Sequence, residues 1–197
     1  IGKGVDRIHH LINSMFDLTL LREDMPMEYR PVTVSKFLDD YAGPFVGIAA
    51  LVLVLDQLSK WLVLATMPLH HSIAVIPGFF NLTHVHNPGG AFGFMANKNP
   101  GLRNLLFLLI SSLAICLLFY FYKKTPQKYA LLSTCFALIL GGAFGNLIDR
   151  IRFGKVIDFL DCYIGSYHWP AFNVADSAIT VGVGIYVILV IFKKMPE

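Results

Sequence analysis

The sequence is poor in charged residues. Only 15% of its 197 residues are Asp, Glu, Lys or Arg, whereas 55% are hydrophobic. Soluble globular domains usually carry about 25% charged residues, so most of this chain is not expected to face water. Its formal net charge of +3 does not indicate nucleic-acid binding, because the Lys and Arg residues stand in short groups beside apolar stretches. That placement is typical of membrane topology, and no nucleic acid is expected as a partner.

Cysteine pairs and the common hydrolase motifs are also missing. Of the three cysteines, Cys116 and Cys135 lie in apolar runs and Cys162 stands alone, so no disulfide framework or zinc spacing is visible. Neither HExxH nor GxSxG occurs, which removes the usual signatures of zinc proteases and of α/β-hydrolases. Ser59 and Lys60 adjoin, whereas a serine–lysine motif places them three apart. Acidic catalysis is what this inventory leaves.

A metal site at the histidines is disfavoured. His84 and His86 form an HxH pattern, and in an extended segment both side chains would face the same way. However, residues 44–193 contain no Glu and no zinc-protease motif. We therefore expect metal-free histidines at the membrane interface, and no cofactor.

Four apolar runs are each long enough to cross a bilayer, which takes about 20 residues. They occupy residues 44–66, 102–122, 129–150 and 174–192. Lysines follow the second run at 123, 124 and 128, and the fourth at 193 and 194. Because basic loops stay in the cytoplasm, both termini are expected inside and residues 67–101 and 151–173 outside. The sequence predicts a mainly α, integral membrane four-helix protein.

The outer segments are rich in aromatic residues, which suits the membrane interface. In the first of them, Ile73 and Val75 alternate before a turn at Pro77-Gly78, and Phe80 and Leu82 alternate after it. This pattern predicts a small outer β-hairpin lying on the membrane.

The first 43 residues differ from the rest of the chain. They hold seven acidic and five basic residues, whereas residues 44–193 hold five Asp and no Glu. Apolar residues recur there at helical spacing, as in an interfacial helix. We therefore predict a polar, amphipathic segment 1–43, with no assigned role, and a single membrane domain over residues 44–197.

Every acidic residue between 44 and 193 is expected at the outer face of the membrane. These residues are Asp56, Asp149, Asp158, Asp161 and Asp176. An ionisable group at mid-membrane costs roughly 2.5 to 3.5 kcal/mol on insertion scales, so such groups usually have a function. Two carboxyl groups that share one proton can activate a water molecule for hydrolysis. Five acids offer several pairs, and their spacing alone does not choose between them.

Structural explanations also exist for these polar residues. Asp56 and Lys60 are four apart and can neutralise each other within one helix. Asn146, Asp149 and Arg150 share a helix face next to glycines that permit close packing. Asn173, three residues before Asp176, suits a helix N-cap.

Five blocks in series resemble lipoprotein signal peptidase, also called signal peptidase II. They are Asp56-Gln57-Leu58-Ser59-Lys60, Asn87-Pro88-Gly89-Gly90-Ala91-Phe92, residues 141–150 (GGAFGNLIDR), Val156-Ile157-Asp158-Phe159 and Phe172-Asn173-Val174-Ala175-Asp176-Ser177. The resemblance covers roughly residues 44–193. It implies a membrane aspartyl endopeptidase that removes the signal peptide from diacylglyceryl-modified prolipoproteins by cutting before the lipidated cysteine.

The resemblance also assigns roles to residues. It implies that Asp158 and Asp176 are the catalytic pair. The residues implied to bind substrate or support the pair are Asn146, Arg150, Asn173, Asn87, Asp56 and Lys60. Asp149 and Gly142 are expected to be structural, with Asp149 a partner near Arg150. Asp161 matches no motif position and is expected to be solvated, and Asp158 is expected near the outer end of the third helix.

The implied setting is the bacterial cytoplasmic (inner) membrane, with the active site at its outer face. The expected partners are the diacylglyceryl-prolipoprotein and membrane lipids, and the chain is expected to act as a monomer. Two other classes stay open. A transporter or proton relay should place acids along a path across the membrane, and the second apolar run has none. A receptor or assembly subunit would explain the glycines but not the acids.

Overall fold

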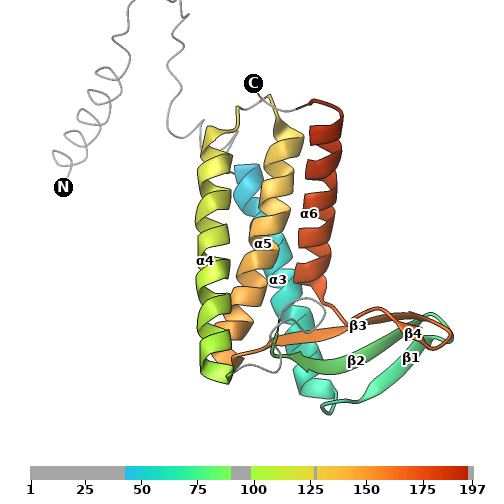
Figure 1. The fold of residues 1–197 in the computed structure, drawn as a ribbon. Helices are drawn as coiled ribbons and strands as arrows, with labels where there is room; N and C mark the ends of the chain where they lie inside the picture. The colour runs from blue at the N-terminus through green and yellow to red at the C-terminus, as the bar shows by residue number, and fades with distance from the viewer. Residues whose placement is uncertain (1–42, 90–98, 127, 195–197) are drawn as a thin grey trace, which may run out of the picture. The chain divides into compact units, whose positions relative to one another are not determined.

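The computed structural model describes residues 43–89, 99–126 and 128–194. With the labels of Figure 1, its helices are α3 (Gly43–Thr66), α4 (Pro100–Lys124), α5 (Ala130–Phe153) and α6 (Val174–Ile191). All four are long and apolar enough to cross a membrane. The four predicted spans are confirmed, with helix ends displaced by three residues or fewer. The segment predicted before residue 43 lies outside the described residues.

Helix α5 packs against each of the other three helices. Two of its glycines make this close approach possible. A Cβ atom added at Gly141 would lie 2.6 Å from the Ala49 carbonyl oxygen of α3, and one at Gly142 would overlap the Ala175 carbonyl oxygen of α6. The close packing predicted for these glycines is therefore present, and it holds α3 and α6 against the polar end of α5.

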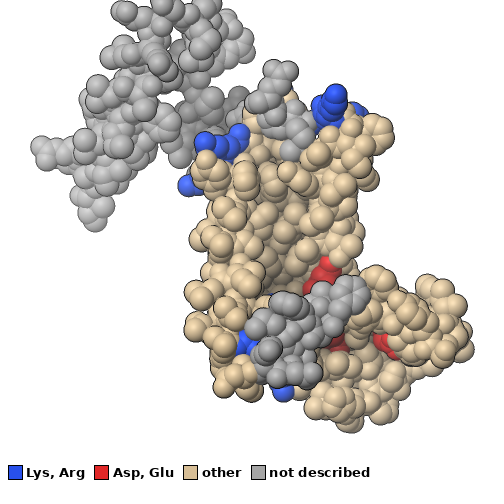
Figure 2. All heavy atoms as spheres, in the orientation of Figure 1, with Lys and Arg blue, Asp and Glu red and all other residues tan. Residues whose placement is uncertain are grey.

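The outer faces of the helices are apolar and exposed. On α4, the side chains of Leu105, Leu109 and Leu113 are each more than half exposed. Exposed leucines in a row are unfavourable in water but suit contact with lipid chains. The sides of the helices in Figure 2 are likewise largely free of charge, whereas Lys and Arg side chains stand at both ends and the visible acidic groups lie near the sheet.

An antiparallel four-stranded sheet lies at one end of the helices (Figure 1). Its strands, in spatial order, are β1 (Ser72–Ile76), β2 (Phe80–Asn87), β3 (Val156–Ile164) and β4 (Tyr167–His168). The predicted hairpin is confirmed as β1 and β2. The prediction missed β3 and β4, because β3 is buried on both faces and so lacks an alternation of polar and apolar residues.

Asp158 lies just past the outer end of the third helix, as predicted, but in a strand that the sequence did not predict. Helix α5 ends at Phe153, and Gly154 caps it with a left-handed backbone (φ 68°) that ends the helical path. Asp158 therefore lies within β3, where it is paired across the sheet with Val85 of β2. Its neighbours Ile157 and Phe159 pack on Val63 of α3 and on Met67 just after that helix, which anchors the strand to the helices and turns Asp158 to the other face.

Candidate functional site

Two carboxyl groups occupy the junction between the sheet and the helices. Asp158, 2% exposed, accepts hydrogen bonds from Nδ2 of Asn87 at 3.0 Å and from Nδ2 of Asn173 at 2.7 Å. Asp176, in the first turn of α6, accepts one from Nδ2 of Asn146 at 2.8 Å. Its other oxygen accepts the backbone N–H of Asn173 at 3.3 Å, completing a capping box. Asn173 thus contacts both carboxyl groups, in addition to its predicted capping role.

The surroundings of Asp158 favour its protonated form. Burial and the negative charge of Asp176 raise the pKa of Asp158 to about 7, although its bonds from Asn87 and Asn173 act in the opposite direction. Asp158 can therefore hold a proton near neutral pH, where an ordinary aspartate would be ionised.

Lys60 fixes the neighbouring ion pairs. Its ammonium lies 2.8 Å from Asp56 and 2.9 Å from Asp149, and all three side chains are almost fully buried. The pair within the helix that the sequence suggested is present, but it is half of a larger cluster. Asp149 was expected near Arg150, whereas its charged partner is Lys60. The Asp149 oxygen that contacts Lys60, Oδ2, also accepts the backbone N–H of Ile157 in β3 at 3.2 Å.

Gln57 is a member of this cluster that the sequence reasoning did not assign. Its Nε2 donates to Oδ1 of Asp149 at 3.1 Å and to the Gly145 carbonyl at 3.2 Å. Asp56 in turn accepts the backbone N–H of Ala175 at 2.9 Å. The sequence did offer a signal for Gln57, because it is a polar residue next to Asp56 inside an apolar run. These bonds fasten α3 to α5 and to the start of α6.

Arg150 has an aromatic partner. Its guanidinium carbon lies 4.9 Å from the centre of the Phe107 ring of α4, a cation–π contact. Nη1 also lies 3.4 Å from the Asn146 carbonyl of its own helix. The side chain is half-buried and borders a cavity, so the positive charge is held close to both carboxyl groups. Phe107 gave no signal in the sequence, since it is one of many apolar residues in its run.

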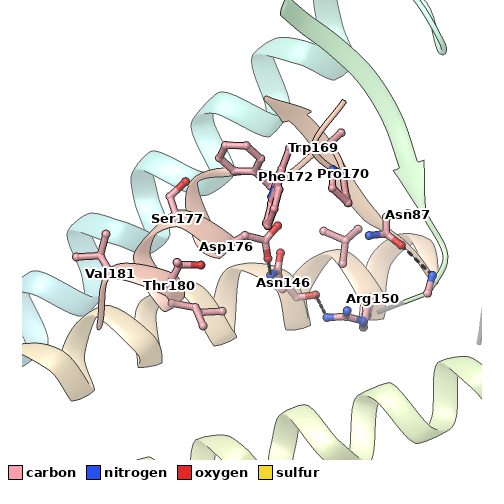
Figure 3. Close-up of a pocket in the computed structure, with 14 residues that line it drawn as sticks. Asn87, Asn146, Arg150, Trp169, Pro170, Phe172, Asp176, Ser177, Thr180 and Val181 are labelled. Carbon is pink, nitrogen blue, oxygen red and sulfur yellow. Dashed lines mark hydrogen bonds between the residues drawn. The ribbon is translucent and has the colours of Figure 1, made fainter. Parts of the chain in front are cut away.

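A cavity of about 640 Å³ opens beside these groups. Its polar part is formed by Asn87, Asn146, Arg150 and Asp176, which surround one end of it in Figure 3. The remaining wall includes residues 169–172 before α6 and Ile179, Thr180 and Val181 on α6. Asp158 is reached from this cavity through Asn87, which both lines the cavity and contacts its carboxyl group. Its volume lies within the usual range of ligand-binding pockets, about 300–1,000 Å³.

The expectation that Asp161 is solvated is wrong. Asp161 is only 9% exposed, and its carboxyl group contacts Asn81 at 2.9 Å and Nδ1 of His168 at 2.8 Å. The strand pairing that brings these residues together was not predicted, so no sequence signal identified the contacts. Asp161 belongs to a second polar network, apart from that of Asp158 and Asp176.

The histidines of β2 contact each other. Nδ1 of His84 lies 2.8 Å from the Met67 carbonyl, so this nitrogen donates, and Nε2 of His84 lies 3.1 Å from Nε2 of His86. Burial and nearby positive groups lower the pKa of His86. Within the described residues, no three His, Cys, Asp or Glu side chains gather as metal ligands would. Metal independence stays a prediction.

The other residues singled out from the sequence meet at this junction. Asn87, Asn146 and Asn173 contact the two carboxyl groups directly. Asp56, Lys60 and Asp149 form the charged cluster behind Asn146. Gly142 touches neither carboxyl group and instead packs against Ala175.

Comparison with known proteins finds one matching family model and several similar sequences. Residues 48–192 match the family model described as "Signal peptidase (SPase) II". The chain is 54% identical over 150 residues to a lipoprotein signal peptidase of Desulforapulum autotrophicum, covering 76% of this chain and 93% of that protein. It is 49% identical over 153 residues to one of Syntrophus aciditrophicus, covering 78% and 94% respectively.

Among solved structures, the chain is similar to one titled "Bacterial membrane enzyme structure by the in meso method at 2.3 A resolution". The TM-score is 0.71 with 34% sequence identity, over 78% of this chain and 91% of that one.

Proposed function

The chain belongs to the signal peptidase II family, and from that premise we propose that Asp158 and Asp176 are the two carboxyl groups that cleave its substrate. The family's activity is removal of signal peptides from prolipoproteins. This chain is therefore an aspartic endopeptidase of the bacterial membrane. The observation that carries the residue assignment is the pair of amide-bonded carboxyl groups beside the cavity, one buried and one half-buried.

The environments of the two carboxyl groups support different roles. The pKa of about 7 for Asp158 favours a protonated acid, which can donate to the oxygen of the scissile carbonyl. Asp176 lines the cavity and is half-buried, so it can take a proton from an attacking water molecule. The water oxygen then bonds to the carbonyl carbon, and collapse of that intermediate with proton return releases the amine of the lipidated cysteine. Asn87 must yield its contact with Asp158 as substrate enters.

The neighbouring side chains support binding and charge control. Arg150 borders the cavity and keeps donors available to a substrate carbonyl. Asn146 and Asn173 hold the two carboxyl groups, and Lys60 with Asp56 holds Asn146 through the charged cluster. Contacts of these side chains with the substrate can thus hold the peptide bond in position for attack by water.

The proposed substrate is a diacylglyceryl-prolipoprotein, held by a cavity that adjoins the lipid-facing helices. Acyl chains that stay in the bilayer would keep the cleavage site at headgroup depth, where the sheet meets the helices. We propose that the sheet faces the outer side, that both termini are cytoplasmic, and that a single chain is active. Lys123 and Lys124 at the far end of α4, and Lys193 and Lys194 after α6, support this orientation.

Replacement of each carboxyl group tests the pair. Asp158→Asn and Asp176→Asn keep the side-chain shape but remove proton exchange, so each is expected to abolish cleavage of a lipid-modified precursor by purified protein in mixed micelles. The precursor should still bind. Ser59→Ala is the matched control, because Ser59 Oγ only contacts carbonyls of its own helix; it should cleave normally, which also tests a serine–lysine alternative. Near-normal turnover by either Asn variant would remove that residue from the assignment.

A further inference from the structure

We propose that Asp161 and His168 form a positioning pair that holds one wall of the cavity, residues 169–172, and thereby sets how tightly the substrate binds. The proposal rests on the proposed function in one respect, since it takes the cavity to be the substrate site. The pair lies outside the network of Asp158 and Asp176, and none of the roles assigned above uses it.

The carboxyl group of Asp161 joins three strands. It is carried by β3, and Nδ1 of His168 on β4 lies 2.8 and 3.1 Å from its two oxygens. Nδ2 of Asn81 on β2 donates to it at 2.9 Å. A carboxylate this far from water needs such donors, because an unpaired one would cost several kcal/mol. Both donors are therefore held tightly to Asp161.

The ring of His168 is fixed by a second contact. It stacks on the ring of Tyr163, with centroids 4.7 Å apart and an angle of 7° between the planes. The Tyr163 hydroxyl accepts the backbone N–H of Gly78 in the β1–β2 turn at 2.9 Å. His168 is still half exposed, so its position depends on these contacts and not on deep burial.

Backbone bonds anchor the wall at its two ends. Immediately after His168, the N–H of Trp169 donates to the Cys162 carbonyl at 2.8 Å. At the far end, the N–H of Phe172 donates to the Leu160 carbonyl at 3.0 Å, and the Phe172 carbonyl accepts two N–H groups of β3. Three backbone bonds thus hold the Phe172 end, whereas the Trp169 end directly follows β4 and its pairing with β3.

Between these anchors the two strands differ in length. On β3 only Asp161 separates the anchoring residues, whereas Pro170 and Ala171 separate them on the other strand. An extra residue makes a strand arch away from its partner, and Pro170 has no N–H with which to pair. All four residues of this arch line the cavity. The first end of the arch directly follows His168, so the Asp161–His168 contact holds the residue from which the arch leaves the sheet.

The expected kinetic effect is specific. Loss of the pair should loosen the Trp169 end of the arch but leave Phe172, Asn173 and Asp176 where their own bonds hold them. The arch touches the substrate away from the reacting atoms, so its displacement weakens ground-state and transition-state binding equally. KM then rises while kcat stays nearly constant.

Two substitutions of His168 separate this role from general structural damage. His168→Phe keeps a ring for Tyr163 but has no donor for Asp161, whereas His168→Asn keeps an amide donor. Loss of a hydrogen bond to a buried carboxylate predicts about a tenfold rise in KM for His168→Phe, with kcat within about twofold, in mixed micelles of fixed composition. His168→Asn should recover most of the loss in KM.

A fluorescence measurement reports on the wall itself. The chain has two tryptophans, and Trp61 on α3 is well exposed, so Trp61→Phe leaves Trp169 as the single emitter. In that background, acrylamide should quench Trp169 more strongly in the His168→Phe protein than in the parent or in His168→Asn.

The outcomes are distinguishable. Equal KM values for His168→Phe and the parent, or a fall in kcat with unchanged KM, would overturn the positioning role, since lost active protein produces the second pattern. Failure of the parent itself to cleave the precursor would count against the proposed function instead. The quenching comparison would still decide the positioning role in that case, because unchanged quenching in His168→Phe contradicts it.

Discussion

Nζ of Lys60 lies 3.0 Å from Oδ1 of Asn146, and this contact decides which way the Asn146 amide points. An ammonium can only donate, so the amide oxygen must face Lys60. The amide nitrogen is then left to donate to Asp176 at 2.8 Å. A charged group on α3 thus orients the hydrogen bond that a carboxyl group on α6 receives, through a side chain on α5.

Removal of the Lys60 charge should destabilise the protein strongly. Lys60→Met leaves Asp56 and Asp149 as buried carboxylates without their cation, and breaking a buried ion pair in this way costs about 3–5 kcal/mol. Thermal unfolding in detergent, followed by circular dichroism, measures the loss. Lys123→Met, at an exposed position on α4, is the control and should unfold near the parent temperature. Equal melting of both variants would contradict the charged-cluster interpretation.

Added methyl groups should discriminate between glycines. In Gly145→Ala the new Cβ would overlap Oδ2 of Asp56, and in Gly142→Ala it would overlap the Ala175 carbonyl oxygen. Overpacking of this kind costs about 1–3 kcal/mol or more. Gly184→Ala on α6 meets nothing within 4 Å and should be neutral or stabilise the helix by up to about 1 kcal/mol. Gly145→Ala and Gly142→Ala should therefore melt at lower temperatures than the parent, and Gly184→Ala should not. A loss of stability in Gly184→Ala would show that the space available for the added methyl group does not decide the effect.

The pH profile should depend on Asn87. Activity that needs protonated Asp158 falls as pH rises through about 7. The bond from Asn87 stabilises the ionised form in the free enzyme, so Asn87→Ala should raise the pKa of Asp158 and move the alkaline limb of kcat/KM to higher pH, by roughly half a unit to one unit. Movement to lower pH would contradict the assignment of Asp158 as the acid. Because the two carboxyl groups interact, the bell-shaped profile reports the pair.

The raised pKa of Asp158 also has a consequence for stability. The folded chain retains this proton to higher pH than the unfolded chain, so the contribution is complete below the ordinary aspartate pKa and is lost as pH rises through about 7. Asp158→Asn removes this dependence. Between pH 5 and pH 8 the melting temperature of Asp158→Asn should therefore fall less than that of the parent.

The orientation can be tested by labelling. In a background with Cys116, Cys135 and Cys162 replaced by Ala, Ser166→Cys in the exposed β3–β4 turn should react with an impermeant maleimide in intact cells. Lys124→Cys, exposed at the opposite end of α4, should react only after permeabilisation. The reverse pattern would place the sheet in the cytoplasm and rule out the proposed site of cleavage.

Much of the fold could be predicted because it depends on local features of the chain. The four spans follow from run length and hydropathy, and the β1–β2 hairpin follows from alternation around Pro77-Gly78. The Asp56–Lys60 pair follows from helical spacing alone, and the close packing at Gly142 follows from its lack of a side chain. The family, with the residues it implies, was accessible from five motifs in series.

Only the tertiary structure decided which distant residues meet. Asp158 lies beyond α5 because Gly154 ends that helix, and it contacts Asn87 of β2, 71 residues away in sequence. Lys60 faces Asp149 on another helix as well as Asp56 on its own, and Asp161 is buried because β2 and β4 flank it. Such contacts arise from packing between elements, which local spacing does not encode, and so composition and periodicity determined the membrane-spanning framework while tertiary packing determined the arrangement of its charges.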